Sequence, residues 1–256
     1  MFHYLFTNDL RIANLQEMLT EAGACFATDT VPSASENKSK NNNFMTLGFY
    51  FNLTTDSNCA KACANGDVRK VVLNFIKKFQ FPNPRTTESL NDCINDGITL
   101  APMRTVIKIL YMMNLIGFDN PCLTRTEIAR FIFFDESIAK NVSPDLMSVI
   151  NRIKENRESV GIDEDFPSED TLKAKGYHWA WCERQIREMV KILCWSGCVK
   201  EDFDGRIRIS HSDLTRENEA DIFEIINYND FWKPDVTKNA SGNKESYQEY
   251  MDIEYV

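Results

Sequence analysis

The sequence predicts a mainly α-helical protein with small β-hairpins, organised as helix-turn-helix and winged-helix modules. First, apolar residues recur at three- and four-residue spacing in several segments, which is the period of a helix buried on one side. Second, residues 187–210 show a helical pattern, a glycine and two short alternating runs around Asp204-Gly205, the order of the second half of a winged helix. Third, 43% hydrophobic and 26% charged residues in a chain of 256 are typical of a globular protein.

Composition shifts and prolines divide the chain into four predicted regions. They are an N-terminal helix-loop-strand-helix region that would suit a further winged helix (1–84), a helical helix-turn-helix-like module (85–162), a winged-helix module (163–232) and a C-terminal tail (233–256). The run 164–170 is acidic and contains a proline, as expected for a linker. A chain of this length can bury the core of each module.

The N-terminal region begins with a predicted helix and continues with less regular patterns. Asp9 is a candidate cap for a helix over Leu10–Gly23. The segment Pro32–Asn43, PSASENKSKNNN, is polar and of low complexity, which predicts a mobile loop or linker. From Phe44 the sequence FMTLGFYFNLTTD alternates and predicts a strand.

A longer helical region is predicted from Ser57. Its apolar face lies opposite a basic one, and the pattern stops at Phe81-Pro82-Asn83-Pro84 because proline cannot continue a helix. The apolar positions are Val68, Val71, Val72, Phe75, Ile76 and Phe79, and the basic ones are Arg69, Lys70, Lys77 and Lys78. Residues 85–101 are polar and predict turns.

Three short helices are predicted in the second module. The first spans Met103–Met113; the second opens at Thr124 with Glu127 three positions later, a capping box. The third opens at Ser143-Pro144 with proline at the first helical position. Its expected exposed side carries charges of both signs, among them Arg152, Lys154 and Arg157, so the module is a weak candidate for DNA contact.

The 163–232 module carries the candidate binding residues. Apolar residues at Ile186, Met189, Val190 and Leu193 define one helix face, and basic residues follow the same spacing on another. In the hairpin, side chains two apart share a face, so the arginines point outward while Ile207 and Ile209 point inward. The predicted DNA contacts are Arg184, Arg187 and Lys191 from the helix in a major groove, and Lys200, Arg206 and Arg208 from the hairpin to phosphates.

A solvated basic face or a protein-docking winged helix explains the same residues nearly as well. Beyond this module, Ser212 is the predicted cap of a helix over 213–228, and the polar tail 233–256 is expected to be partly mobile or docked on another part.

Charge and cysteine usage limit the classes of function. A formal net charge of −9 excludes a protein that coats nucleic acid non-specifically, so DNA binding requires a local basic patch or a partner. Neither the pair Cys59/Cys63 nor Cys194/Cys198 is completed to a zinc quartet, and the eight cysteines are expected to be reduced core thiols. With no signal peptide and no apolar run of membrane length, we expect a cytoplasmic protein without a membrane partner.

The order of several segments resembles the DNA-recognition part of AlwI-type type II restriction endonucleases. The segments are NFIKKFQFPNPR (Asn74–Arg85), APMRTVIKILYMM (Ala101–Met113), LTRTEIARFIF (Leu123–Phe133), NRIKENRE (Asn151–Glu158) and REMVKILCWSGCVKEDFDGRIRIS (Arg187–Ser210). The resemblance covers about residues 70–210 and implies a winged-helix reader of double-stranded DNA. It also implies a PD-(D/E)xK nuclease that uses Mg²⁺ held by carboxylates.

That nuclease motif is not visible in the chain. Pro234-Asp235 and Pro144-Asp145 are each followed by lysine before glutamate, the reverse of the required order. No glycine-rich phosphate loop, nucleophile elbow or H-E-x-x-H motif occurs, and His3, His178 and His211 are isolated. We therefore expect no catalytic residues, no metal site and no cofactor, with Mg²⁺ needed only if a nuclease site is present.

Three functions stay open from the sequence. The first is a DNA-binding module of a restriction or phage-defence system that acts with a separate nuclease or ATPase subunit. The second is a structural adaptor whose winged helices bind proteins, favoured by the acidic charge balance and the aromatic residues of the tail after Phe231. The third is a divergent or fragmentary AlwI-type endonuclease.

Overall fold

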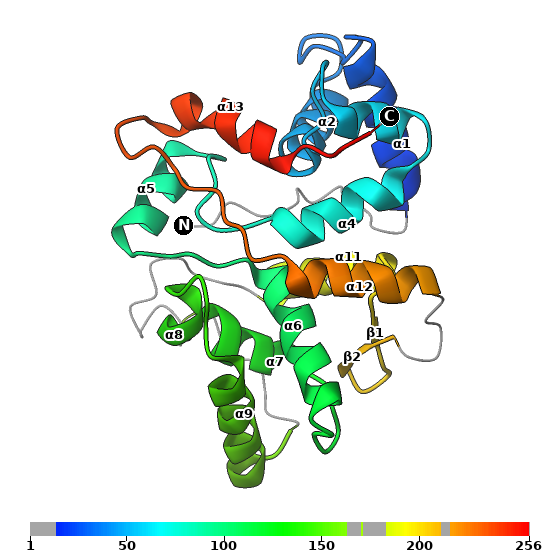
Figure 1. Cartoon of the computed structure of the whole chain (residues 1–256). Helices are drawn as coiled ribbons and strands as arrows, with labels where there is room; N and C mark the ends of the chain where they lie inside the picture. The colour runs from blue at the N-terminus through cyan, green and yellow to red at the C-terminus, as the bar shows by residue number, and fades with distance from the viewer. Residues whose placement is uncertain (1–13, 163–169, 171–182, 211–215, 256) are drawn as a thin grey trace.

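The computed structural model describes residues 14–162, 170, 183–210 and 216–255, and it is mainly α-helical with one two-stranded sheet in these ranges (Figure 1). The predicted fold class is confirmed. The elements are α1 (Leu15–Ala27), α2 (Lys38–Phe51), α3 (Asn58–Ala64), α4 (Val68–Lys78), α5 (Thr87–Asn95), α6 (Pro102–Leu115), α7 (Arg125–Ile128) continued by the π-helix η2 (Ala129–Phe133), α8 (Glu136–Ala139), α9 (Leu146–Val160), α11 (Glu183–Trp195), β1 (Val199–Glu201), β2 (Ile207–Ile209), α12 (Arg216–Asn227) and α13 (Ala240–Met251).

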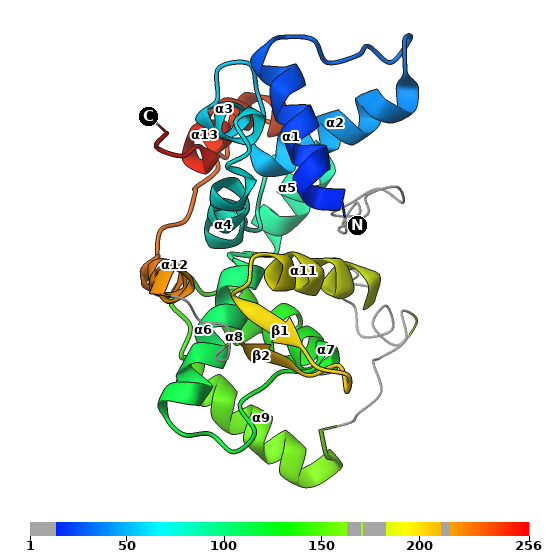
Figure 2. The same cartoon turned by 90° about the vertical axis from the view of Figure 1, so that its right-hand side faces the viewer.

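The N-terminal helices form the upper part of the molecule in Figures 1 and 2. Helices α1 and α3 pack so closely that a Cβ at Gly23 would lie 2.5 Å from the Cβ of Cys63, so only glycine fits there. Helix α1 begins at Leu15 and ends at Ala27, four residues beyond the predicted end. Asp9, its predicted cap, lies outside the described residues.

Helix α2 corrects two predictions at once. The loop expected over Pro32–Asn43 is wrong from Lys38 onward, and the strand expected from Phe44 is wrong, because Lys38–Phe51 is one helix. Asn37 caps it by accepting a hydrogen bond from the backbone N–H of Lys40 at 3.0 Å. The buried side chains are Phe44, Leu47, Tyr50 and Phe51, whose spacing is helical as well as partly alternating. The segment is helical rather than extended because its cap, Asn37, lies seven residues before Phe44, inside the polar run.

The predicted helical region after Ser57 is broken into α3 and α4 by a turn in which Gly66 has φ +89°. Helix α4 ends at Lys78, and the prediction that the proline-rich segment stops it is confirmed. Residues 85–101 are not only turns, since α5 forms there. Thr86 caps α5 by accepting from the N–H of Ser89 at 3.1 Å.

The predicted helices of the second module are confirmed as α6, α7 and α9, with two corrections. Thr124 and Glu127 form the predicted capping box of α7. Helix α9 begins at Leu146 and is capped by Asp145, so Pro144 is not at its first position. Arg157 is not on an exposed side: its side chain is 12% exposed and holds Glu127 at 2.7 Å.

Helix α11 and the hairpin that follows it are confirmed as predicted. Gly197 ends the helix with φ +81°, and β1 pairs with β2 in antiparallel register (Figure 2). A third segment joins the sheet, because Leu123 and Ile207 form an antiparallel bridge with N–H···O distances of 2.9 and 2.8 Å. The hairpin of the predicted 163–232 module is thereby bonded to a segment of the predicted 85–162 module.

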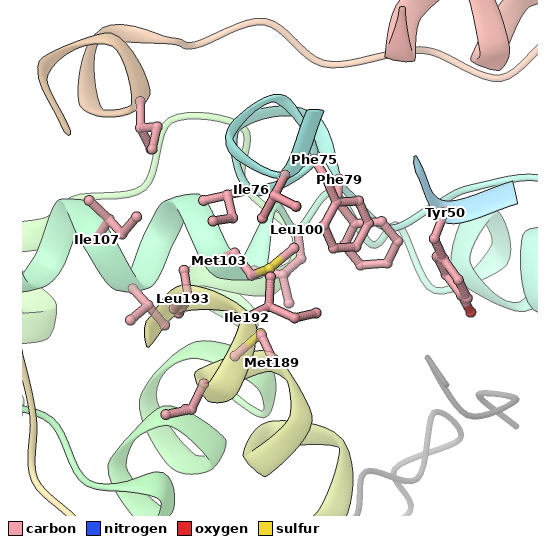
Figure 3. Packing of buried hydrophobic residues seen from close by; sticks show 14 of the residues in the cluster. Tyr50, Phe75, Ile76, Phe79, Leu100, Met103, Ile107, Met189, Ile192 and Leu193 are labelled. Carbon is pink, nitrogen blue, oxygen red and sulfur yellow. The ribbon is translucent and has the colours of Figure 1, made fainter. Parts of the chain in front are cut away.

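One apolar cluster runs through the elements that hold this hairpin. Figure 3 shows Phe75 and Ile76 of α4, Met103 of α6 and Ile192 and Leu193 of α11 meeting in it. All five are 1% exposed or less. Helix α11 is therefore fixed to α4 and α6 by burial of apolar surface.

The tail also packs on the rest of the chain. Helix α13 buries Tyr247 and Met251, so the docked alternative holds for 240–251. The cysteines in the described ranges, Cys25, Cys59, Cys63, Cys93, Cys122, Cys194 and Cys198, are all free thiols, as predicted. Ser212 lies outside the described residues. Among the helices that the structure describes, none is long and apolar enough to cross a membrane.

Candidate nucleic-acid interface

The candidate surface is built first from the outer side of α11. Ile186, Met189 and Val190 are 1% exposed or less, which fixes the rotation of the helix about its axis. Arg187 and Lys191 therefore lie on the solvent side, with side chains 39% and 48% exposed. Arg184 belongs to the same helix, but its side chain lies outside the described part of the structure.

The outer face of the hairpin carries the other predicted contacts. Val199, Ile207 and Ile209 are at most 3% exposed, so the prediction that the isoleucines point inward is confirmed. The opposite face carries Lys200, Arg206 and Arg208, and Lys200 lies directly opposite Arg208 in the register. Like charges on opposed strand positions disfavour pairing unless an anion lies between them.

Carboxylates of the chain neutralise part of this charge. The Arg208 Nε donates to an Asp202 carboxylate oxygen at 2.8 Å, and its Nη2 donates to the side-chain oxygen of Asn120. On α11, the nitrogens of Arg187 and Lys191 lie 3.6 and 3.5 Å from one oxygen of Glu188. Arg208 is thus held in place, while the two α11 cations share one carboxylate at distances longer than a direct hydrogen bond.

Two residues to which the sequence assigned no such role hold the hairpin in position. Arg125, at the start of α7, binds Glu201 of β1 at 2.5 Å. Arg157 of α9 donates to the backbone oxygens of Asn120 at 3.1 Å and Cys122 at 2.6 Å, which fixes the segment that bridges to β2. No local pattern marks these contacts, because each joins residues at least 35 positions apart.

Helix α2 offers a further polar surface, which the prediction of a loop for this segment did not anticipate. Lys38, Ser39 and Asn42 are exposed along its first turns, whereas Lys40 binds Glu21 at 2.6 Å. Lysine and asparagine on an exposed helix can contact phosphates and base edges. The signal that would have found this helix is Asn37 as a cap followed by the three- and four-residue spacing of Phe44, Leu47 and Phe51.

Metal chemistry has no visible support in the ranges that the structure describes, where no group of three or more His, Cys, Asp or Glu side chains could hold an ion. The expectation of no catalytic residues and no cofactor stays a prediction.

The family follows from a match over most of the chain. Residues 46–228, from the middle of α2 through α12, match the model of the family described as restriction endonuclease BpuJI, N terminal. The chain belongs to this family. The matched range of the BpuJI N-terminal family includes α11, both strands and the bridging segment at Leu123.

A solved structure shows that the fold is shared as well. It is a crystal structure of pyrene- and phenanthrene-modified DNA in complex with the BpuJ1 endonuclease binding domain. The superposition has a TM-score of 0.71 at 16% sequence identity and covers 98% of this chain and 96% of that chain. No curated protein matches the chain. The finer resemblance to AlwI-type enzymes stays a prediction.

Proposed function

We propose that this chain is a DNA-binding recognition module of a restriction enzyme, in which α11 and the hairpin form the contact surface. The observation that carries the proposal is the placement of Lys200 directly opposite Arg208 on the hairpin, together with the exposure of Arg187 and Lys191 on the preceding helix α11. A DNA phosphate backbone is an anionic partner that suits cations gathered in this way. Arg184, on the same helix, belongs to the proposed contact set.

The order of elements supports a winged helix. Helix α6, the bridging residue Leu123, α7, α11, β1 and β2 follow one another in the order helix, strand, helix, helix and two-stranded wing. Helices α8 and α9 lie between α7 and α11 in the chain and are an insertion relative to the simple motif. In such a module the third helix enters the major groove and the wing lies along the phosphates. Membership of the BpuJI family and the DNA in the related complex support the same partner.

The acidic body restricts how this module binds. Because the net charge is −9, only the local cations attract DNA, and the rest of the protein surface repels it. Three phosphate contacts from the hairpin would give a slope of log affinity against log salt of about −2.7. In this proposal the module acts with a separate nuclease or ATPase subunit and does not itself cut DNA.

The test is a gel-shift series on random duplex DNA at several salt concentrations, with and without Mg²⁺. We expect binding without cutting by this chain. The double variant Arg206→Ala/Arg208→Ala should lower affinity evenly across sequences and flatten the salt slope by about 1.8. Because Arg208 also holds Asp202, circular dichroism checks that the hairpin variant is folded, and Arg206→Ala alone should give half the change in slope.

Each other outcome has a definite meaning. Unchanged affinity in the double variant removes the hairpin from the interface. Failure of the unaltered chain to bind DNA at low salt favours the protein-docking adaptor, and cutting in the Mg²⁺ lanes shows a nuclease site within this chain.

A further inference from the structure

A cavity of about 360 Å³ lies away from the α11 and hairpin surface, between α6, the segment joining α8 to α9, and the segment after α12. Its walls are largely apolar, and they are formed in part by Tyr111, Met112, Leu115, Val142, Leu146 and Ile226. A pocket of this size with apolar walls and a few polar groups is typical of a small-molecule site.

Two cations line the same cavity without a carboxylate partner. Arg104 is 2% exposed and donates to the backbone oxygens of Lys77 at 3.1 Å and Asp230 at 3.0 Å. Lys108, one turn further along α6, donates to the backbone oxygen of Tyr228 at 3.0 Å and to the side-chain oxygen of Asn229 at 2.7 Å. Within the described ranges, neither cation forms an ion pair with an acidic side chain.

The surroundings disfavour the charge on Lys108. Burial, with the positive Arg104 nearby as the second cause, lowers the pKa of Lys108 to about 8. Buried charges in proteins are ordinarily paired, because removing an ion from water without a counter-ion costs several kcal/mol. Arg104 also lies over the rings of Tyr228 and Phe231, 5.1 and 4.5 Å from their centroids, whereas the half-buried Lys108 is bound only by neutral oxygens. Lys108 is therefore the cation in this cavity that most lacks a counter-ion.

The mouth of the cavity is apolar and exposed. Leu115 and Val142, which line it, are 69% and 50% exposed. Phe223 of α12 is 44% exposed and packs edge-on against Tyr111, with ring centroids 5.7 Å apart. Large apolar side chains gathered in this way mark a contact site for an apolar group.

We propose that this cavity binds a small organic anion, a carboxylate attached to an apolar body, with the carboxylate at Lys108 and Arg104 and the carbon body against Tyr111, Leu115 and Val142. At roughly 30 Å³ per non-hydrogen atom the cavity holds on the order of ten such atoms, the size of a medium-chain or aromatic carboxylate. The proposal does not depend on DNA binding, since it uses a different surface.

Binding is expected to depend on pH with a definite sign. A bound carboxylate interacts with protonated Lys108, so affinity should be full below about pH 8 and fall as the pH rises through the pKa of that amine. The charged or titratable groups around it are Arg104 and Tyr111 on the same helix and Tyr228 and Asp230 after α12, whereas the α8–α9 segment contributes the non-titrating Asn141 and Ser143.

The test uses octanoate as the probe and octan-1-ol as the neutral control, with isothermal titration calorimetry and thermal denaturation on the full chain. We expect saturable octanoate binding that raises Tm, and at least tenfold weaker binding of the alcohol. Lys108→Met should reduce octanoate affinity about tenfold or more, and Lys108→Arg should retain it. Lys61→Met, an exposed lysine on α3, serves as the matched control and should change nothing.

Three outcomes overturn the proposal. They are no octanoate binding at millimolar concentration, equal binding of octanoate and octan-1-ol, and unchanged affinity in Lys108→Met. A short DNA duplex is added in a competition arm. If it displaces octanoate, the cavity belongs to the DNA interface and the small-molecule assignment is wrong, whereas DNA and octanoate binding together supports both proposals.

Discussion

Helices α4 and α11 both carry cations along one side and apolar residues along the other, but the chain covers only the basic side of α4. Arg69 of α4 binds Asp221 of α12 at 2.6 Å, and Lys77 pairs with Glu224 of the same helix. Lys70 donates to the backbone oxygen of Glu254 at 2.6 Å. The cations of α4 thus attach α12 and the C-terminal segment to the core.

The cations of α11 are used differently. Arg187 and Lys191 approach one carboxylate, Glu188, which lies on their own helix, and both keep more than a third of their side-chain surface exposed. A basic stripe is therefore structural or available for binding according to what other elements place on it. The sequence of the helix alone does not distinguish the two.

The largest effect expected from this difference is on DNA affinity. The double reversal Arg187→Glu/Lys191→Glu should weaken binding on the order of 100-fold at low salt, because it removes two phosphate contacts and adds repulsion. Tm should change by only a few degrees, since both side chains are exposed. Fluorescence anisotropy with labelled duplex and thermal denaturation measure the two quantities.

The matched control is Lys70→Glu on α4, a reversal of an exposed lysine on the covered helix. This single reversal changes the net charge by half as much as the double reversal on α11. When that difference is allowed for, it should change DNA affinity by less than about threefold. An equal loss of affinity in the control would mean that the effect is one of net charge, and the distinction between the helices would be lost.

The hairpin surface was predictable from the sequence because its determinants are local. The spacing of Ile186, Met189 and Val190 sets the helix face, Gly197 ends the helix, and Asp204-Gly205 sets the turn. Each of these signals acts within a few residues. The fold class and the inward isoleucines followed from the same signals.

What the sequence missed depends on partners far along the chain. The burial of Arg157 against Glu127 and the bridge of Leu123 to Ile207 link segments 30 or more residues apart, and no local period reports them. Helix α2 was missed for a different reason. Its polar first turns resemble a linker in composition, and helix formation there depends on burial of Phe44 and the residues after it.

A second effect, smaller than the first, is expected on stability. Arg69→Met should lower the free energy of unfolding by about 1–2 kcal/mol, because it removes the ion pair of the 34% exposed arginine with Asp221 and its 2.8 Å hydrogen bond to Asn218. The salt slope of DNA binding should stay unchanged. Urea denaturation measures the first quantity, and a change in slope would place α4 in the DNA interface.

The smallest predicted effect concerns Glu188 of α11, the carboxylate that lies near both Arg187 and Lys191. Glu188→Gln keeps the shape of the side chain and removes the negative charge near Arg187 and Lys191, so DNA affinity should rise about threefold at low salt with a slightly steeper salt dependence. Stability should change by less than about 1 kcal/mol, because both nitrogen–oxygen distances are at least 3.5 Å and both cations are more than a third exposed, although the side chain of Glu188 is only 14% exposed. Anisotropy titrations at three salt concentrations measure the change. Unchanged affinity, together with a loss in the hairpin variant, would restrict the DNA contact to the hairpin and orient α11 away from the phosphates.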